Sequence, residues 1–197
     1  MNNTIDYYNK NADRFIENTI NSNMETVYNI FLKYVIPNGK ILDLGCGSGR
    51  DSKEFIKRGY SVVAIDGSQE MCKRASDYIG QEVACTLFNE IEYKDEFDGV
   101  WACATLLHLP KEVLPEVIAR ISRALKDNAY FYLSFKYGGF SGERNGRFFT
   151  DMNEETFQEL IRKYSEFEII ETMITEDVRP YRENEKWLNI VLRKNCI

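Results

Sequence analysis

Short apolar runs alternate along the chain with stretches whose apolar residues recur every three or four positions. The short runs predict buried strands at "KILDLG" (40–45), "SVVAIDG" (61–67), "EVACTLF" (82–88), "FDGVWACA" (97–104) and "AYFYLSFK" (129–136). The helical spacing predicts helices over 50–59 and 69–79 and around residues 113–125 and 157–164. "FEIIETMI" (167–174) and "KWLNIVLRK" (186–194) predict two last strands joined by a polar hairpin.

Local signals at the ends of these elements support the assignment. Ser22-x-x-Glu25 matches a capping box and predicts a helix whose apolar side continues to Val35. Gly59 predicts the end of the helix over 50–59, because a helix often ends in a left-handed glycine.

Strands separated by helices indicate parallel βαβ units and therefore a doubly wound α/β fold. The last two strands lack a crossover helix, so the final strand is predicted to run antiparallel to its neighbours. We therefore expect a mostly parallel seven-stranded sheet with a terminal antiparallel hairpin. The 197 residues suit a single domain, 1–197, with residues 1–36 forming N-terminal helices.

Composition excludes several classes of protein. No apolar run reaches the roughly 18 residues of a membrane span, and the polar start lacks a secretory signal, so we expect a cytoplasmic protein without membrane partners. The five cysteines form no C-x-x-C pair and His108 is the only histidine, so we expect no metal site. The net charge of −6 disfavours DNA as a partner.

The stretch "ILDLGCGSGRD" (41–51) places three glycines directly after the first predicted strand. In a doubly wound sheet, ligands bind beyond the carboxyl ends of the strands. Glycines let a ligand lie against the backbone, and the following helix offers free N–H groups. A tight structural turn is the alternative explanation for such a loop.

Asp66 favours a ligand over a simple turn. It ends the second predicted strand, 21 residues after Gly45, where a carboxylate can bind ribose hydroxyls. A helix N-cap is the alternative role for Asp66, although Ser68 is better placed for it. A dinucleotide loop needs a small third residue, and this chain has Arg50 there.

With Asp43-Leu-Gly-Cys-Gly-Ser-Gly49 and Asp66, the chain resembles the class I S-adenosylmethionine-dependent methyltransferases from about residue 40 to 194. The resemblance implies a Rossmann-like methyltransferase fold with S-adenosylmethionine as cofactor. It implies that the glycine loop holds the methionine part, that Asp43 helps to hold the amino group and that Asp66 binds the ribose. The family's acidic adenine contact corresponds to Asn89 or Glu90, and "WACATLLHLP" (101–110) corresponds to the segment near the reactive methyl group. The expected cofactor residues are Asp43, Gly45, Cys46, Gly47, Gly49, Arg50, Asp66, Gly67, Ser68, Met71, Asn89, Glu90, Cys103 and Ala104.

Two residues are candidates for assisting methyl transfer. His108, at the active end of the sheet, is the obvious general base, with packing at a helix start as the alternative. Tyr8 lies on one face of a predicted N-terminal helix with Ala12 and Phe15. In similar methyltransferases such a helix covers the cofactor and turns a tyrosine inward, so residues 1–36 are expected to cap the cofactor site. A surface helix that packs its aromatic side is the alternative.

Two loops suggest a substrate. "KYGGFSGERNGRFF" (136–149) and "TEDVRPYRENEK" (175–186) are expected at the active end, where they bring together Arg144, Arg147, Arg179 and Arg182. Arginine suits bidentate recognition of phosphate or carboxylate, which favours a small anionic substrate. A solvated surface mixture in which neighbouring acids pair with these arginines is the alternative.

The sequence therefore predicts an S-adenosylmethionine-dependent methyltransferase acting on a small molecule. No [DNS]-P-P-[YFW] motif and no Pro-Cys pair is present, which disfavours DNA-base acceptors, while RNA remains an alternative through the arginines. Two other classes remain as alternatives: a dinucleotide-dependent oxidoreductase, which Arg50 in place of the third glycine opposes, and a regulator that binds the cofactor without catalysis.

Overall fold

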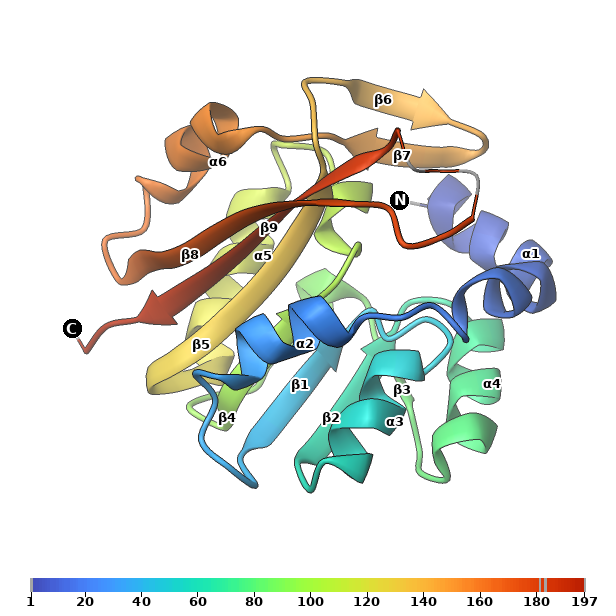
Figure 1. Ribbon diagram of the computed structural model, residues 1–197, viewed down its shortest axis with the longest axis horizontal. Helices are drawn as coiled ribbons and strands as arrows, with labels where there is room; N and C mark the ends of the chain where they lie inside the picture. The colour runs from blue at the N-terminus through green and yellow to red at the C-terminus, as the bar shows by residue number, and fades with distance from the viewer. Residues whose placement is uncertain (1, 181, 183, 197) are drawn as a thin grey trace.

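The computed structural model describes residues 2–180, 182 and 184–196. Its central sheet has the strand order β3-β2-β1-β4-β5-β9-β8 (Figure 1). The seven strands are β1 (Lys40–Leu44), β2 (Ser61–Asp66), β3 (Ala84–Cys85), β4 (Phe97–Ala102), β5 (Leu125–Lys136), β8 (Phe167–Glu176) and β9 (Lys186–Lys194).

The direction of the strands confirms the predicted fold class. The pairs β1–β2, β1–β4, β2–β3 and β4–β5 are parallel. Strand β9 is antiparallel both to β5 and to β8, so β8 runs in the same direction as the first five strands. The connection between β8 and β9 therefore lies at the same edge of the sheet as the loops that follow β1, β2 and β4.

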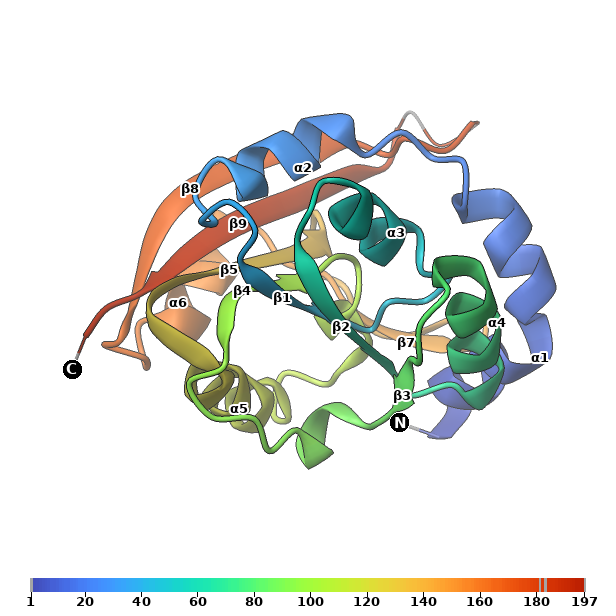
Figure 2. The ribbon, with the colours of Figure 1, turned by 90° about the horizontal axis from the view of Figure 1, so that it is seen from below.

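Helices cover both faces of this sheet (Figure 2). On one face lie α2 (Glu25–Leu32), α3 (Arg50–Lys57) and α4 (Gln69–Ile79), and on the other lie α5 (Leu114–Ala124) and α6 (Glu154–Ile161). Helix α1 (Asn2–Thr19) lies beside α4, and two 3₁₀ turns, η1 (Phe88–Glu90) and η2 (Leu106–His108), follow β3 and β4.

Side chains alternate between the two faces, as the period of a strand requires. On β4, Trp101 packs toward α2 and α3 while Val100 packs toward α5. On β5, Tyr132 stacks on Trp101 with ring centroids 3.9 Å apart, and Phe131 packs on the opposite face. All four side chains are fully buried, so each face of the sheet carries its own hydrophobic core.

The segment after β5 differs from the prediction of a loop. Strands β6 (Ser141–Arg144) and β7 (Arg147–Thr150) form a separate antiparallel hairpin. Asn145 and Gly146 connect them with φ values of 51° and 77°. Two positive φ values at an Asn-Gly pair are the turn geometry that matches the twist of a hairpin, so the sequence carried this signal.

Two other details of the prediction were wrong. Helix α2 has no side-chain cap from Ser22, and instead the Asn23 Oδ1 accepts a hydrogen bond of 2.9 Å from the backbone N–H of Glu25. The third strand is limited to Ala84–Cys85, because the chain turns into η1 directly afterwards. Gly59, in contrast, follows α3 with a φ of 90°, as a helix end requires.

The long hairpin of β8 and β9 is irregular near the start of β8, away from the connection between the two strands. The register between β8 and β9 shifts between Ile169 and Glu171, which marks a bulge in β8. The Glu171 side chain then accepts hydrogen bonds of 2.8 Å from both Lys33 and Tyr34, which follow α2. The bulge thus aims a carboxylate at the helical layer.

Gly99 on β4 tests how tightly α2 packs on the sheet. A Cβ at this position would lie 2.7 Å from Cζ of Phe31 and 3.0 Å from Cγ2 of Val35. We predict that Gly99→Ala lowers the free energy of unfolding by about 1–3 kcal/mol, the usual cost of overpacking, measured by urea denaturation. Gly139→Ala is the matched control, since a Cβ there meets nothing within 4 Å. Equal stability of the two variants would contradict this packing.

Candidate functional site

A cavity of about 880 Å³ opens at the carboxyl ends of the parallel strands. Its wall contains residues of the glycine loop, the end of β2, the segment after β4, helix α1 and the β8–β9 connection. This volume falls within the range of small-molecule sites, and the position is where doubly wound sheets bind ligands. The side chains of the candidate site face this cavity or lie behind its wall.

The glycine loop has a backbone conformation that residues with a side chain would adopt only with strain or a steric clash. Gly45, Gly47 and Gly49 have φ values of 74°, 54° and 77°, a region that favours glycine. A Cβ on Gly45 would lie 2.5 Å from Cγ2 of Thr105. The N–H groups of Gly45 and Cys46 bond to the carbonyl oxygen of Ile65 at 2.8 and 3.0 Å. The loop is therefore a fixed cradle tied to the end of β2.

Asp66 links this cradle to helix α4. One carboxylate oxygen accepts from the N–H of Gly47 at 2.9 Å, and the other accepts from the N–H of Ser68 at 2.8 Å. The hydroxyl of Ser68 accepts from the N–H of Met71 and caps α4, so Asp66 is not the helix cap. Burial raises the pKa of Asp66, against the opposing effect of these N–H groups. A carboxylate thus lies in the cavity wall where the sequence placed the ribose contact.

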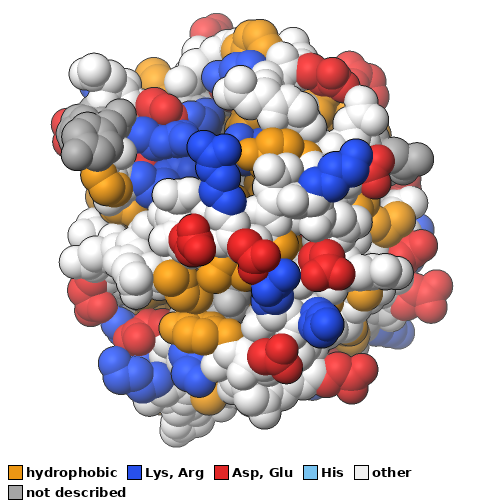
Figure 3. Space-filling model, turned by 90° about the vertical axis from the view of Figure 1, so that its right-hand side faces the viewer, with side chains coloured by type: hydrophobic (Ala, Val, Ile, Leu, Met, Phe, Trp, Pro, Cys, Tyr) orange, Lys and Arg blue, Asp and Glu red, His pale blue; other side chains and the backbone are white. Residues whose placement is uncertain are grey.

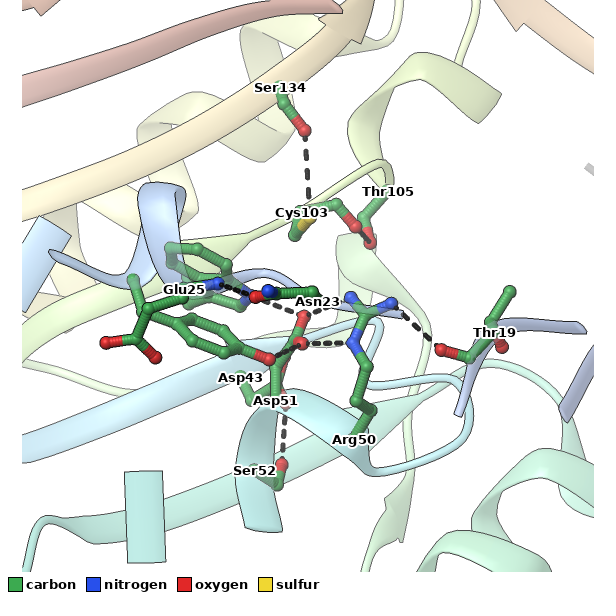
Figure 4. A network of polar contacts seen from close by, with 12 residues as sticks. Thr19, Asn23, Glu25, Asp43, Arg50, Asp51, Ser52, Cys103, Thr105 and Ser134 are labelled. Atoms are coloured by element: carbon green, nitrogen blue, oxygen red, sulfur yellow. Dashed lines mark hydrogen bonds and ion pairs between the residues drawn. The ribbon is translucent and has the colours of Figure 1, made fainter. Parts of the chain in front are cut away.

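A buried polar network lies behind the loop (Figure 4). Asp51 accepts from the hydroxyl of Tyr28 at 2.5 Å and from the indole Nε1 of Trp101 at 2.8 Å. Arg50 binds the same carboxylate through Nε at 2.6 Å and through Nη2 at 3.0 Å. Burial opposes ionisation, but the Arg50 charge and these hydrogen bonds more than offset it and lower the pKa of Asp51.

Asp51 was not among the site residues expected from the sequence. Its only signal was an acid directly after Arg50, and its role depends on Tyr28 and Trp101, which are distant in sequence. The remaining terminal nitrogen, Nη1 of Arg50, donates to the carbonyl of Thr19 at 3.3 Å, and the Arg50 side chain lines the cavity.

Asp43 lies behind the loop and does not line the cavity. Its Oδ2 accepts a hydrogen bond of 2.6 Å from Ser52, and its side chain is 1% exposed. Burial and the neighbouring Asp51 charge raise the pKa of Asp43 to about 8. Of the two carboxyl groups, Asp51 is therefore the one that ionises more readily.

Three other expected cofactor residues lie outside the cavity wall. Gly49 packs against α4, where a Cβ would lie 2.9 Å from Ile79. Glu90 binds the N–H of Leu87, while the Asn89 Oδ1 is buried without a partner in the described part of the chain. Leu87 and Phe88 line the cavity in place of Asn89 and Glu90. The remaining expected residues do line it: Gly45, Cys46, Gly47, Arg50, Asp66, Gly67, Ser68, Met71, Cys103 and Ala104.

Tyr8 and His108 form a hydrogen-bonded pair in the wall of the cavity. Nδ1 of His108 lies 2.7 Å from the carbonyl oxygen of Phe148, which can only accept, so Nδ1 carries the proton. Nε2 therefore accepts from the hydroxyl of Tyr8 at 2.9 Å. Burial lowers the pKa of His108 to about 4, and the Arg147 charge adds to the decrease. Burial also raises the pKa of Tyr8.

The four arginines of the two loops all line the cavity. Arg144 forms an ion pair with Asp151, Arg179 with Asp177 and Arg182 with Glu185. Arg147 instead lies over the ring of Tyr7, and its Nη1 donates to the hydroxyl of Tyr8 at 3.3 Å. Figure 3 views the molecule from the side on which α1 lies, and lysine and arginine side chains gather in the upper part of that view.

Lys136 and Trp187 complete this side of the cavity and were missed by the sequence analysis. Lys136, at the end of β5, forms an ion pair with Glu185 and lies over the ring of Trp187. Burial and the nearby charge of Arg179 lower the pKa of Lys136 to about 8. Neither residue belongs to a recognisable motif, and both reach the cavity only because β9 pairs with β5.

The comparisons with known proteins agree with this geometry. Residues 41–128 match the family model described as a methyltransferase domain. The carboxy-S-adenosyl-L-methionine synthase of Shewanella loihica is 31% identical over 115 residues, which cover 53% of this chain and 47% of that protein. The chain thus spans about half the length of that relative. Its match to a Yarrowia lipolytica sterol 24-C-methyltransferase covers 27% of that enzyme.

Solved structures match over almost the whole chain. The 1,6-didemethyltoxoflavin-N1-methyltransferase of Burkholderia thailandensis superposes with a TM-score of 0.77 at 20% identity, covering 98% of this chain and 85% of that one. The magnesium protoporphyrin IX methyltransferase of Synechocystis superposes with a TM-score of 0.74 at 20% identity, covering 96% and 97%. Both were crystallised with S-adenosylhomocysteine. Residues 41–128 thus match a methyltransferase domain, and the fold of the chain is the one that these S-adenosylmethionine-dependent methyltransferases share.

Within the described residues, the structure has no helix that combines the length and the apolar character needed to cross a lipid bilayer.

The buried His108 predicts a loss of stability in acid. Its folded pKa of about 4 lies below the ordinary 6.5, so the unfolded chain binds the proton first and stability falls as the pH drops through this window. Between about pH 7 and about pH 4.5 the wild type should lose roughly 2 kcal/mol more than His108→Asn, measured by urea denaturation. Parallel pH dependences in the two proteins would contradict the burial of a neutral ring.

Proposed function

We propose that this protein transfers the methyl group of S-adenosylmethionine to a small anionic molecule. One observation carries the proposal: the glycine cradle with Asp66 and a cluster of cationic side chains face the same cavity. A nucleoside cofactor fits the first part, because Gly47 leaves the cavity wall without a side chain at that point and the Asp66 carboxylate lies beside it. The cations suit an anionic acceptor beside it.

The cofactor would lie along the wall from the glycine loop to helix α4. In this proposal the loop holds the methionine part and Asp66 the ribose, as the family resemblance implies. Arg50 uses Nε and Nη2 on Asp51 and keeps further N–H groups for the carboxylate of the cofactor. Asp43 acts from behind the loop rather than by direct contact.

Residues 1–36 cap this site in the proposed arrangement. Thr4, Tyr8, Phe15 and Thr19 of α1 line the cavity, as do Met24 and Val27 at the start of α2. Asn9 accepts a hydrogen bond of 2.7 Å from Ser68, which ties α1 to the segment after Asp66. A cap of this kind excludes water from the reacting atoms.

The bound cofactor supplies a methyl group already activated by a sulfonium, so the protein mainly holds the acceptor in line with it. Tyr8 and His108 form a path for a proton that leaves the acceptor. The Tyr8 oxygen accepts that proton while its own proton passes to Nε2 of His108. Because protonation of His108 is costly in the free protein, the relay suits acceptors that lose their proton readily.

The substrates in the names of similar proteins support a small acceptor. Those proteins act on 1,6-didemethyltoxoflavin, magnesium protoporphyrin IX and sterols. Three of the four arginines pair with acids, as the alternative of a surface charge mixture predicted, and the Arg144 and Arg182 side chains are 36% and 42% exposed, yet all four line the cavity. RNA remains the competing acceptor that the first experiment addresses.

The proposal is tested with S-adenosylmethionine that carries a labelled methyl group, incubated with the protein and an extract of host cells. We expect label in the small-molecule fraction and, with Asp66→Asn, a loss of S-adenosylhomocysteine affinity of about tenfold, as for a lost charged hydrogen bond. Label in an RNase-sensitive polymer would show that RNA, and not a small molecule, is the methyl acceptor. Binding of S-adenosylhomocysteine without any labelled product would identify a regulator, and binding of NADH would identify an oxidoreductase.

The relay predicts different effects for two adjacent tyrosines. Tyr8→Phe keeps the ring beneath Arg147 but removes the hydroxyl, so kcat should fall by about a hundredfold with little change in KM. Tyr7→Phe, the matched control, removes a hydroxyl that has no place in the relay and should leave kcat unchanged. Equal kinetics of the two variants, measured with the labelled acceptor, would exclude Tyr8 from proton transfer.

A further inference from the structure

Arg144 and Arg147 lie opposite each other on the β6–β7 hairpin and differ in their partners. Arg144 forms an ion pair with the buried Asp151. Arg147 has no carboxylate within 4.0 Å among residues 2–180, 182 and 184–196. Of the four arginines from these two loops, Arg147 is the one with no carboxylate partner in the described residues, while Arg182 shares Glu185 with Lys136.

Aromatic rings surround Arg147 instead. Its guanidinium carbon lies 4.5 Å from the ring centre of Tyr7, 5.1 Å from that of Phe149 and 5.7 Å from that of Tyr8. Its Nε is buried and has no hydrogen-bond partner in the described residues. Apart from the bond of 3.3 Å from Nη1 to the Tyr8 hydroxyl, the rings satisfy none of its N–H groups, so this guanidinium keeps donors for a ligand in the cavity.

We propose that Arg147 binds the carboxylate of the methyl acceptor and selects acceptors in which a flat ring carries that carboxylate. This inference rests on the proposed function and names its substrate class. The planar fork of a guanidinium matches the two oxygens of a carboxylate. The adjoining wall contains Tyr8, Phe149 and Leu107, which suit a flat apolar body better than a sugar or a flexible chain.

The position of Arg147 also defines where the acceptor group lies. Its Nη1 is 3.3 Å from the Tyr8 oxygen, which in turn bonds to Nε2 of His108. A hydroxyl or amino group next to the carboxylate on the ring therefore reaches Tyr8 while the carboxylate binds Arg147. In the reaction the acceptor atom forms a bond to the methyl carbon as the sulfur–carbon bond breaks, and the acceptor's proton passes through Tyr8 to His108.

The carboxylate also adjusts the base. The positive charge of Arg147 contributes to the low pKa of His108. A carboxylate bound to Arg147 offsets that charge, so the correct acceptor makes His108 easier to protonate at the moment when the relay is used. An uncharged analogue leaves the pKa of His108 low and lacks this effect.

Binding of two isosteric probes tests the inference without turnover. Isothermal titration with the S-adenosylhomocysteine-loaded protein compares 2-hydroxybenzoate with its neutral analogue 2-hydroxybenzamide. The wild type should bind the carboxylate at least about tenfold more tightly, the value of one good charged contact. Arg147→Met should reduce this preference to about twofold or less, and Arg147→Lys should retain part of it because lysine keeps the charge but not the fork.

Arg120→Met is the control, since Arg120 of α5 pairs with Glu116 outside the cavity wall and its loss should preserve the full preference. The proposal is overturned if the wild type shows no preference for the carboxylate, if both probes fail to bind, or if Arg147→Met keeps the preference. It is also overturned if mild alkali releases the label from the methylated product, because the carboxylate itself would then be the acceptor. Loss of S-adenosylhomocysteine binding in the wild type would instead contradict the proposed function.

Discussion

The buried carboxylate of Asp51 holds together the parts on which the site depends. It takes hydrogen bonds from Tyr28 of α2, Trp101 of β4 and Arg50 at the start of α3. These donors come from three different elements around the glycine loop, so the loop between β1 and α3 has little freedom to move. A buried charge of this kind is tolerated only when its partners are all present, which makes the network a constraint on the whole floor of the cavity.

The two halves of the cavity differ in their electrostatics for a physical reason. Near the glycine loop, Arg50 pairs with Asp51, and the Asp66 carboxylate lies in the cavity wall. Near the β6–β7 hairpin and the β8–β9 connection, Arg147 has no acid partner in the described residues, and Lys136 and Arg182 share Glu185, so positive charge is in excess. One half can thus accommodate a zwitterionic cofactor, while the other favours an anion.

The sequence contained the parts of the fold that depend on local periodicity. The strands, the left-handed glycines and the direction of the last hairpin follow from patterns within a few residues. The bond between Tyr8 and His108 and the role of Asp51 could not be predicted, because each depends on side chains brought together only by the finished sheet. The β6–β7 hairpin was predictable from Asn145-Gly146 and was overlooked within a loop that also carried the arginines.

The bulge in β8 bears on how copies of this molecule behave toward one another. Strand β8 is the last in the sheet order, and an unpaired edge is a template for strands from other chains. The bulge between Ile169 and Glu171 interrupts the regular row of backbone groups, and exposed Glu168 and Glu176 place negative charge along it. A second copy approaching edge to edge would meet like charge and an irregular backbone. Pairing of two copies through β8, the strand that leads into the β8–β9 connection, is therefore disfavoured.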